Sequence, residues 1–130
     1  MTRALAPSLA DIDALARGIV GGLPHRFLRE VAAVVVRVED FPDADTAAAM
    51  RLRDPLDLLG LYRGVPLPDK SINDPQPQID MVFLYRRPIL AYCDATGEPL
   101  SRVVRHVLIH EIGHHFGFSD ADMARIEAAR

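Results

Sequence analysis

The segment from His110 to Asp120 contains the residues whose types and spacing point most directly to chemistry. Four residues along an α-helix advance about 400°, so the imidazoles of His110 and His114 lie one turn apart on nearly the same face. Two imidazoles placed in this way can bind one metal ion together. Glu111 lies between them in angle and can reach a water molecule on that ion. The pattern therefore predicts a metal site that activates water.

The third protein ligand has to come from beyond this helix. A catalytic zinc ion is usually held by three protein ligands, and the fourth position is left to water. Gly117 tolerates positive φ and permits a sharp reversal of the chain, and Asp120 follows it closely. We therefore predict His110, His114 and Asp120 as the ligands of Zn²⁺. Glu111 is then the predicted catalytic base.

The extended motif is specific enough to outweigh a chance match. In a chain of this composition, the five-residue pattern His-Glu-x-x-His arises by chance in roughly one sequence in a hundred. Adding Gly117 and Asp120 at their offsets lowers that frequency to below about one in ten thousand. Two imidazoles and a carboxylate favour zinc, although manganese, cobalt or nickel ions can occupy the same ligands in vitro.

Other candidate ligands have simpler interpretations. His106 lies one turn before His110 and is interpreted as an exposed or supporting residue rather than a ligand. His115 is expected at the surface or in an interface, and His25 in a solvated loop. Asp120 itself has an alternative interpretation, because the helix dipole favours any carboxylate in a first helical turn.

One long helix has to position these residues. It is predicted to begin near Pro99, since proline suits the first helical position, and to end near Phe116, with Gly117 as a left-handed cap. Ser119 is predicted to cap a short final helix, with Asp122 at its third position. Apolar residues form one predicted buried arc of the long helix, namely Leu100, Val103, Val104, Val107 and Leu108.

Earlier segments predict a further helix and a small sheet. Helical periodicity covers residues 9–19. Residues 31–38 are β-branched and apolar on both faces, which indicates a central strand. The alternation over 79–85 predicts a second strand, and Arg87-Pro88 is expected to turn the chain into a short partner strand over 89–92. The predicted fold class is α+β, with a small mixed sheet and the long helix across one face.

Two segments keep more than one interpretation. Residues 47–52 allow a helix that Pro42 and Pro55 would limit. The glycine-bracketed segment 60–64 is interpreted with equal weight as a tight turn or as an extended edge for a substrate. Together with the strand at 79–85, it is a candidate for pairing with a peptide by strand addition.

Composition limits the class of protein. A length of 130 residues predicts a single domain over 1–130, and 49% hydrophobic and 25% charged residues are typical of a globular chain. The net charge of −3 argues against a nucleic-acid partner. Cys93 has no partner for an internal disulfide, residues 1–9 lack a signal-peptide pattern, and no stretch predicts a membrane span. We therefore expect a cytoplasmic protein that binds neither nucleic acid nor membrane; its oligomeric state is unknown from sequence.

The segment from His110 to Asp120 resembles the signature of zincin metallopeptidases that bind their metal through two histidines and an aspartate. The closer similarity is to the small bacterial minimal zincin metallopeptidase family, and it also covers residues 60–67 and 79–89. The resemblance implies a minimal zincin-like fold: a small twisted mixed sheet, a long metal-binding helix packed on one face, and a short C-terminal helix. Only ten residues follow Asp120, so a less enclosed substrate cleft is expected than in larger relatives.

The resemblance also implies a function, that of a zinc-dependent metallopeptidase. Such a hydrolase cleaves peptide or unfolded protein substrates with a zinc-activated water, and Glu111 would be its general base. By the same resemblance, the metal ligands are His110, His114 and Asp120. The candidates to stabilise the oxyanion are Tyr62, Tyr85 and an arginine, and the sequence does not choose among them.

Two other functions remain open at the level of sequence. The first alternative is a zinc-binding interaction or regulatory module with little or no hydrolytic activity. The presence of Glu111 favours the enzyme, because a purely structural metal site needs no base beside it. A structural zinc site would also prefer four protein ligands, often cysteines, and the chain has only Cys93. A weaker alternative is a metal-free regulatory or toxin-like partner protein.

Overall fold

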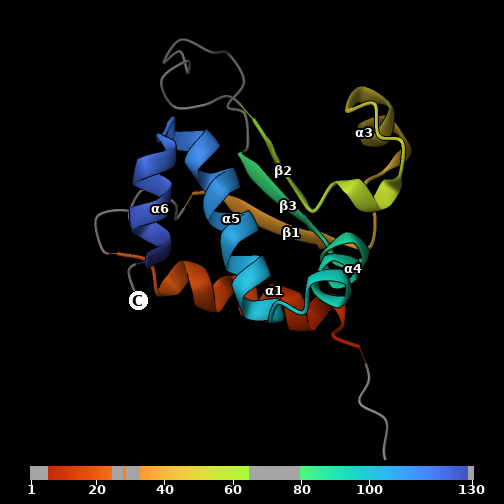
Figure 1. The fold of residues 1–130 in the computed structure, drawn as a ribbon. Helices are drawn as coiled ribbons and strands as arrows, with labels where there is room; N and C mark the ends of the chain where they lie inside the picture. The colour runs from red at the N-terminus through yellow and green to blue at the C-terminus, as the bar shows by residue number, and fades with distance from the viewer. Residues whose placement is uncertain (1–5, 25–27, 29–32, 65–79, 129–130) are drawn as a thin grey trace, which may run out of the picture.

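The computed structural model describes residues 6–24, 28, 33–64 and 80–128, without the side chains of residues 114–116. Over these residues the fold is α+β, as predicted, with helices packed on a three-stranded mixed sheet (Figure 1). No helix within the described residues is both long and apolar enough to cross a membrane.

The sheet contains β1 (Val35–Glu39), β2 (Gly60–Arg63) and β3 (Met81–Tyr85), in the order β1-β3-β2. β3 pairs in parallel with β1 and antiparallel with β2. It is therefore the central strand of the described sheet, and its residues 82–85 are all buried. Residue 79, predicted to begin this strand, lies outside the described residues.

The strand predicted over residues 31–38 is confirmed from Val35 onward, but its predicted central position is wrong. β1 begins at Val35 and lies at an edge of the described sheet. Val35 is 45% exposed, so this strand is covered less completely than its apolar sequence indicates. Strand propensity is a local property, whereas the position of a strand depends on which distant segments pair with it. Residues 31 and 32 lie outside the described part.

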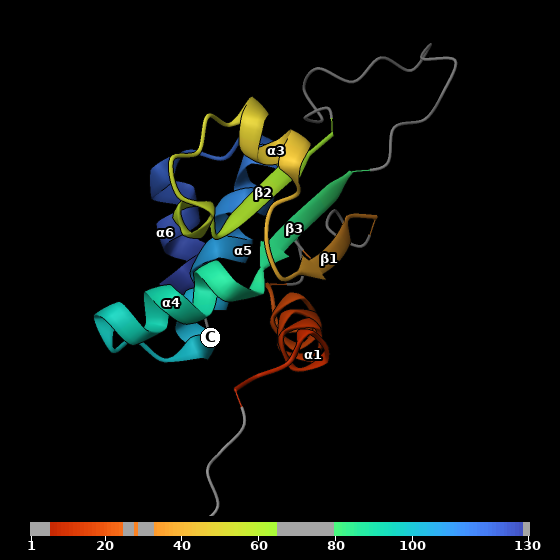
Figure 2. The same ribbon diagram turned by 90° about the vertical axis from the view of Figure 1, so that its right-hand side faces the viewer.

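The helices surround this sheet on several sides (Figure 2). Their bounds are α1 (Leu9–Gly21), α3 (Ala44–Ala49), α4 (Arg86–Thr96), α5 (Leu100–Phe116) and α6 (Asp120–Ala128), and a short 3-10 turn covers Pro55–Asp57. α5 packs against β2 and β3, α1 packs against β1 and α5, and α6 packs along α5. The predicted long helix therefore lies between the sheet and the final helix.

The predicted partner strand over residues 89–92 is also wrong, because these residues belong to α4. Pro88 is the third residue of that helix, where a backbone N–H would have no acceptor within the helix, so proline is tolerated. Arg86 secures the start of the helix: its guanidinium donates to the Asp40 carboxylate and to the Pro7 carbonyl. These contacts join segments far apart in the sequence, which local patterns do not reveal.

The main core lies between α5, α1 and one face of β3. The arc predicted for α5 is confirmed at Val103, Val104, Val107 and Leu108, which are buried, while Leu100 is half-buried. Val82 and Leu84 from β3, and Ile12 from α1, belong to the same cluster. Cys93 packs at the margin of this cluster as a partly buried side chain, which agrees with its expected role as a small hydrophobe.

Gly60 allows α5 to approach β2 closely. A Cβ atom at this position would lie 2.5 Å from Cγ1 of Val107 and 3.0 Å from the carbonyl oxygen of Phe83. Both distances are shorter than normal contacts, so a side chain would force the helix away from the strand. The same point is 3.7 Å from Cγ of Glu111, so this contact also sets where Glu111 lies.

Replacing Gly60 with alanine is expected to destabilise the protein by about 1–3 kcal/mol, as overpacking of a tight contact does. The measurement is urea denaturation followed by circular dichroism. Gly18→Ala is the matched control: no atom lies within 4 Å of its Cβ position, so the same change inside α1 should stabilise by about 0.5–1 kcal/mol. Equal stability of the Gly60→Ala variant and the wild type would contradict a tight contact between helix and strand.

Candidate metal centre and active site

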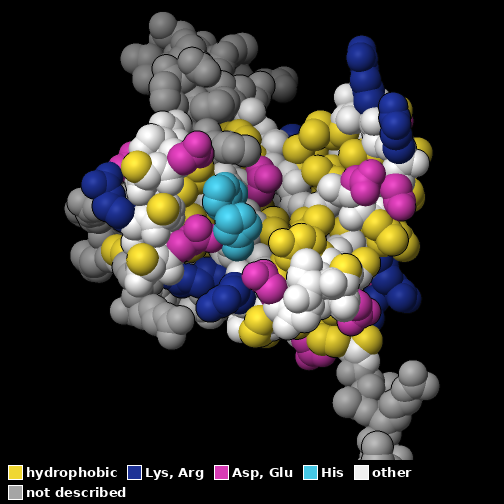
Figure 3. All heavy atoms as spheres, viewed as in Figure 1, with side chains coloured by type: hydrophobic (Ala, Val, Ile, Leu, Met, Phe, Trp, Pro, Cys, Tyr) yellow, Lys and Arg dark blue, Asp and Glu magenta, His cyan; other side chains and the backbone are white. Residues whose placement is uncertain are grey.

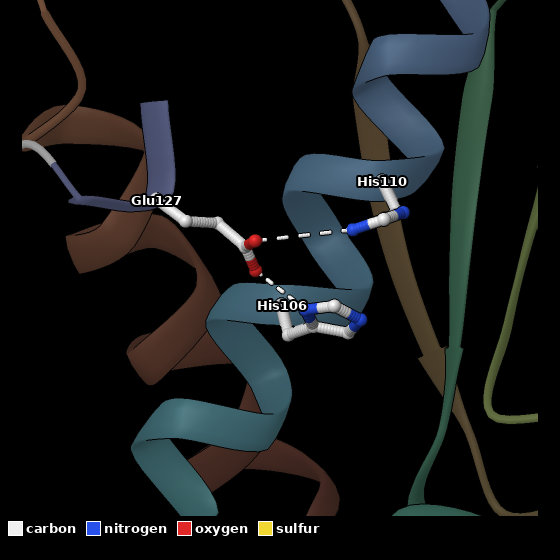
Figure 4. Close-up of side chains that lie close together, drawn as sticks. All are labelled: His106, His110 and Glu127. Atoms are coloured by element: carbon white, nitrogen blue, oxygen red, sulfur yellow. Dashed lines mark hydrogen bonds and ion pairs between the residues drawn. The ribbon is translucent and has the colours of Figure 1, made fainter. Parts of the chain in front are cut away.

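Two histidines of α5 face one carboxylate of α6. Nδ1 of His106 lies 2.5 Å from Oε1 of Glu127, and Nε2 of His110 lies 3.9 Å from Oε2 of the same residue. Figure 4 shows the two imidazoles approaching Glu127 from successive turns of α5. Their ring centroids are 4.1 Å apart. Three side chains that can bind a metal therefore converge where the two helices pack together.

The position of Glu127 depends on how α6 packs against α5. Met123 is buried, and a Cβ atom at Gly113 would overlap its sulfur, so the glycine in α5 makes room for this side chain. Nη2 of Arg105 donates to the carbonyl oxygens of Ile126 at 2.9 Å and Glu127 at 3.2 Å. Arginine thereby satisfies carbonyl groups at the C-terminal end of α6, which have no partner within the helix.

Glu111 lies at the outer edge of β2. Its Oε2 accepts a hydrogen bond of 2.9 Å from the backbone N–H of Tyr62. The N–H of Tyr85 donates to the carbonyl of Leu59, which makes these two residues a hydrogen-bonded pair. Such pairs alternate along antiparallel strands, so the N–H of Tyr62 points away from β3. The carboxylate of Glu111 therefore lies beside the edge of the described sheet.

The bend after α5 forms as the sequence predicts. Gly117 has a φ of 69°, and the N–H of Phe118 donates to the carbonyl of Gly113 at 2.9 Å. Ser119 then caps α6: its hydroxyl accepts from the N–H of Asp122 at 3.1 Å, and the Asp122 carboxylate accepts from the N–H of Ser119 at 3.4 Å. This reciprocal pair is a capping box, and it sets the direction in which α6 leaves the bend.

The predicted ligands are described only in part. His110 is a half-buried residue of α5 whose Nε2 faces Glu127, and Asp120 is an exposed residue in the first turn of α6. The backbone of His114 belongs to α5, but its side chain lies outside the described residues. The convergence of these three residues on one ion therefore stays a prediction. The side chain of His115 and all of His25 also lie outside the described part.

Glu127 is a potential ligand that the sequence analysis did not identify. It follows Asp120 by about two helical turns, so both residues project from nearly the same face of α6. The sequence signal was the histidine at His106, one turn before His110. That residue is exposed, as expected, but its contact with Glu127 depends on which turns of α5 and α6 meet, and helical spacing alone does not give this.

The candidate oxyanion residues have different surroundings. Tyr85 is 2% exposed and stacks with Phe83 at a centroid separation of 6.3 Å, so it is a core residue. The hydroxyl of Tyr62 donates to the buried carboxylate of Asp80 at 2.9 Å. Burial and this carboxylate raise the pKa of the Tyr62 hydroxyl, which therefore stays protonated at neutral pH. Arg86 is engaged by Asp40, as described above.

The sequence pattern of a known family covers most of these elements. The family of zincin-like metallopeptidases matches residues 31–130, which include the whole described sheet together with α5 and α6. The chain belongs to the zincin-like metallopeptidase family. The family resemblance predicted from the motif is thereby confirmed. No match to this zincin-like chain is found among the curated proteins.

Replacing Ser119 with alanine should remove the cap of α6 and destabilise the zincin-like domain by about 1 kcal/mol. The loss is measured as a lower midpoint of urea denaturation. Ser119→Thr is the control, because threonine keeps a hydroxyl that accepts the same hydrogen bond and should retain most of the stability. A threonine variant as unstable as the alanine variant would show that the cap is not the stabilising interaction.

Proposed function

We propose that this zincin-like chain is a zinc-dependent metallopeptidase that uses Glu111 as its general base. One observation carries the proposal: the carboxylate of Glu111 lies at the outer edge of β2, on the helix that also contains His110 and His114. An exposed strand edge can bind an extended peptide through backbone hydrogen bonds. A peptide added along β2 would therefore pass beside the carboxylate.

The donor chemistry of this region fits a zinc ion. Imidazole nitrogens and carboxylate oxygens are its usual ligands, and the side chain of His110 is 36% exposed on α5 with Nε2 directed away from its own helix axis toward α6. We propose His110, His114 and Asp120 as the three protein ligands. When bound, zinc supplies Lewis acidity that polarises the scissile carbonyl and lowers the pKa of water.

In this proposal, β2 would bind the substrate and Glu111 would transfer the proton. Glu111 takes a proton from the attacking water and passes it to the leaving amine. In the structure its carboxylate accepts from the N–H of Tyr62, a donor that an incoming peptide carbonyl can use instead. Substrate binding along β2 would therefore release Glu111 for proton transfer. Backbone pairing alone imposes little sequence preference, which suits unfolded substrates.

The Glu111→Gln variant should bind zinc normally and lose hydrolysis by about 10²–10⁴-fold, the usual contribution of a general base. Glutamine keeps an oxygen that accepts from the N–H of Tyr62, so the fold should be retained. Zinc is measured by elemental analysis and hydrolysis by cleavage of an unfolded protein. Glu98→Gln is the matched control: it makes the same change in the connection between α4 and α5, away from Glu111.

Full activity of the Glu111→Gln variant would refute the assignment of the base. A wild-type protein that binds one zinc ion per chain yet cleaves no unfolded protein would instead support the zinc-binding interaction module. The wild-type protein cleaves in the first result and does not cleave in the second, so one pair of assays separates them.

Replacing Asp120 with alanine should weaken zinc binding by at least about 10- to 100-fold, because a protein ligand is lost. Zinc at about 100 times its dissociation constant should stabilise the wild-type fold by about 2.7 kcal/mol, and this gain should shrink in the variant. Thermal denaturation with and without zinc measures the effect. Asp94→Ala removes an exposed carboxylate from α4 and should keep the full zinc-dependent gain. Unchanged zinc binding by Asp120→Ala would exclude Asp120 as a ligand.

A further inference from the structure

The cluster of His106, His110 and Glu127 is itself a candidate metal site. One donor atom from each residue can be chosen so that all three lie within 4.8 Å of one another. In a tetrahedral zinc site with bonds of about 2.0–2.1 Å, neighbouring donors lie roughly 3.4 Å apart. The contact of 2.5 Å joins His106 to Oε1 of Glu127 and that of 3.9 Å joins His110 to Oε2, and the two distances lie on either side of that value. Side-chain rotation would have to bring one carboxylate oxygen and both ring nitrogens to the required spacing.

The packing of the two helices holds these donors in place. His106 and His110 project from successive turns of one long helix, and Glu127 is positioned by the buried Met123 and by the contacts of Arg105 with the end of α6. The packing of the helices therefore already restricts the positions of the three donor side chains before an ion binds. Preorganised donors of this kind bind a cation with little loss of conformational entropy.

Solvent reaches the cluster from an open groove. His106 and Glu127 line a groove of about 1330 Å³, and the side chain of His106 is 58% exposed. In Figure 3 histidine side chains lie at the surface with carboxylates on both sides. A hydrated cation can therefore approach the donors, and water can complete its coordination. The carboxylate compensates part of the charge of the cation, and the two imidazoles, when neutral, supply lone pairs.

We propose that His106, His110 and Glu127 form a second site for a divalent cation such as Zn²⁺. The site is weaker than the proposed catalytic one, because it is exposed and because an ion must displace the contact between His106 and Glu127. His110 belongs to both ligand sets and can direct its Nε2 to only one ion at a time. An ion in the second site therefore withdraws a ligand from the catalytic set, a consequence that rests on the proposed function.

Metal binding by the full-length His114→Ala variant tests the second site directly. This variant lacks one proposed catalytic ligand but retains the whole cluster. Equilibrium dialysis with Zn²⁺, and the absorption spectrum with Co²⁺, should show one ion per chain. Adding His106→Ala or Glu127→Gln should weaken this binding by about tenfold or more. Adding Glu98→Gln, which changes another carboxylate lining the same groove, should leave it unchanged.

The binding results either support or overturn the second site. Affinities that are the same with and without Glu127→Gln, in variants whose circular dichroism shows a retained fold, would overturn it. So would a His114→Ala variant that binds no ion, or a Glu98→Gln change that weakens binding as much as Glu127→Gln does. None of these outcomes depends on catalysis, so a failure of the proposed peptidase activity leaves the test intact.

Competition for His110 is tested by activity at excess zinc. Relative to its own activity with one equivalent of Zn²⁺ per chain, the wild type should lose hydrolysis as Zn²⁺ rises further, and the Glu127→Gln variant should need a higher Zn²⁺ concentration for the same fractional loss. Equal inhibition of the two proteins would overturn the competition while leaving the binding measurement valid. A wild type with no activity at any zinc concentration would count against the proposed function instead.

Discussion

The close contact between α5 and β2 is the constraint on which the rest of this site depends. Gly60 lets Val107 approach the strand, and one turn later Glu111 reaches the N–H of Tyr62 at 2.9 Å. A helix held further from the sheet would leave that carboxylate in solvent, away from any peptide paired with the strand. The absence of a side chain at Gly60 thus links a packing requirement to the position of the proposed base.

The antiparallel packing of α5 and α6 brings the carboxylate of Glu127 to the histidines of α5 that face it. Gly113 receives Met123, so the end of α6 lies beside earlier turns of α5 and brings Glu127 to His106 and His110. His106 and His110 lie on successive turns of α5 beside Glu127 of α6. This set of donors shares His110 with the proposed catalytic set. Selectivity between them then depends on exposure and on the cost of breaking existing contacts.

The predictions that succeeded and those that failed differ in the range of the interactions involved. The bend at Gly117 and the cap at Ser119 were predictable, because each depends on residues within one or two turns. The failures were α4, which begins where Arg86 meets the distant Asp40, and the edge position of β1. The convergence of His114 with Asp120 follows from the same local motif and stays a prediction, because the side chain of His114 lies outside the described residues.

The amino-acid sequence by itself determined the spacing of the motif, the two helices that flank its bend, and the family to which the chain belongs. These features follow from helical geometry and capping, which act between near neighbours. Only the tertiary structure decided that Glu111 lies at the outer edge of β2 and that Glu127 meets two histidines. Both contacts join surfaces whose alignment depends on side-chain packing across the whole core, and no local pattern encodes that alignment.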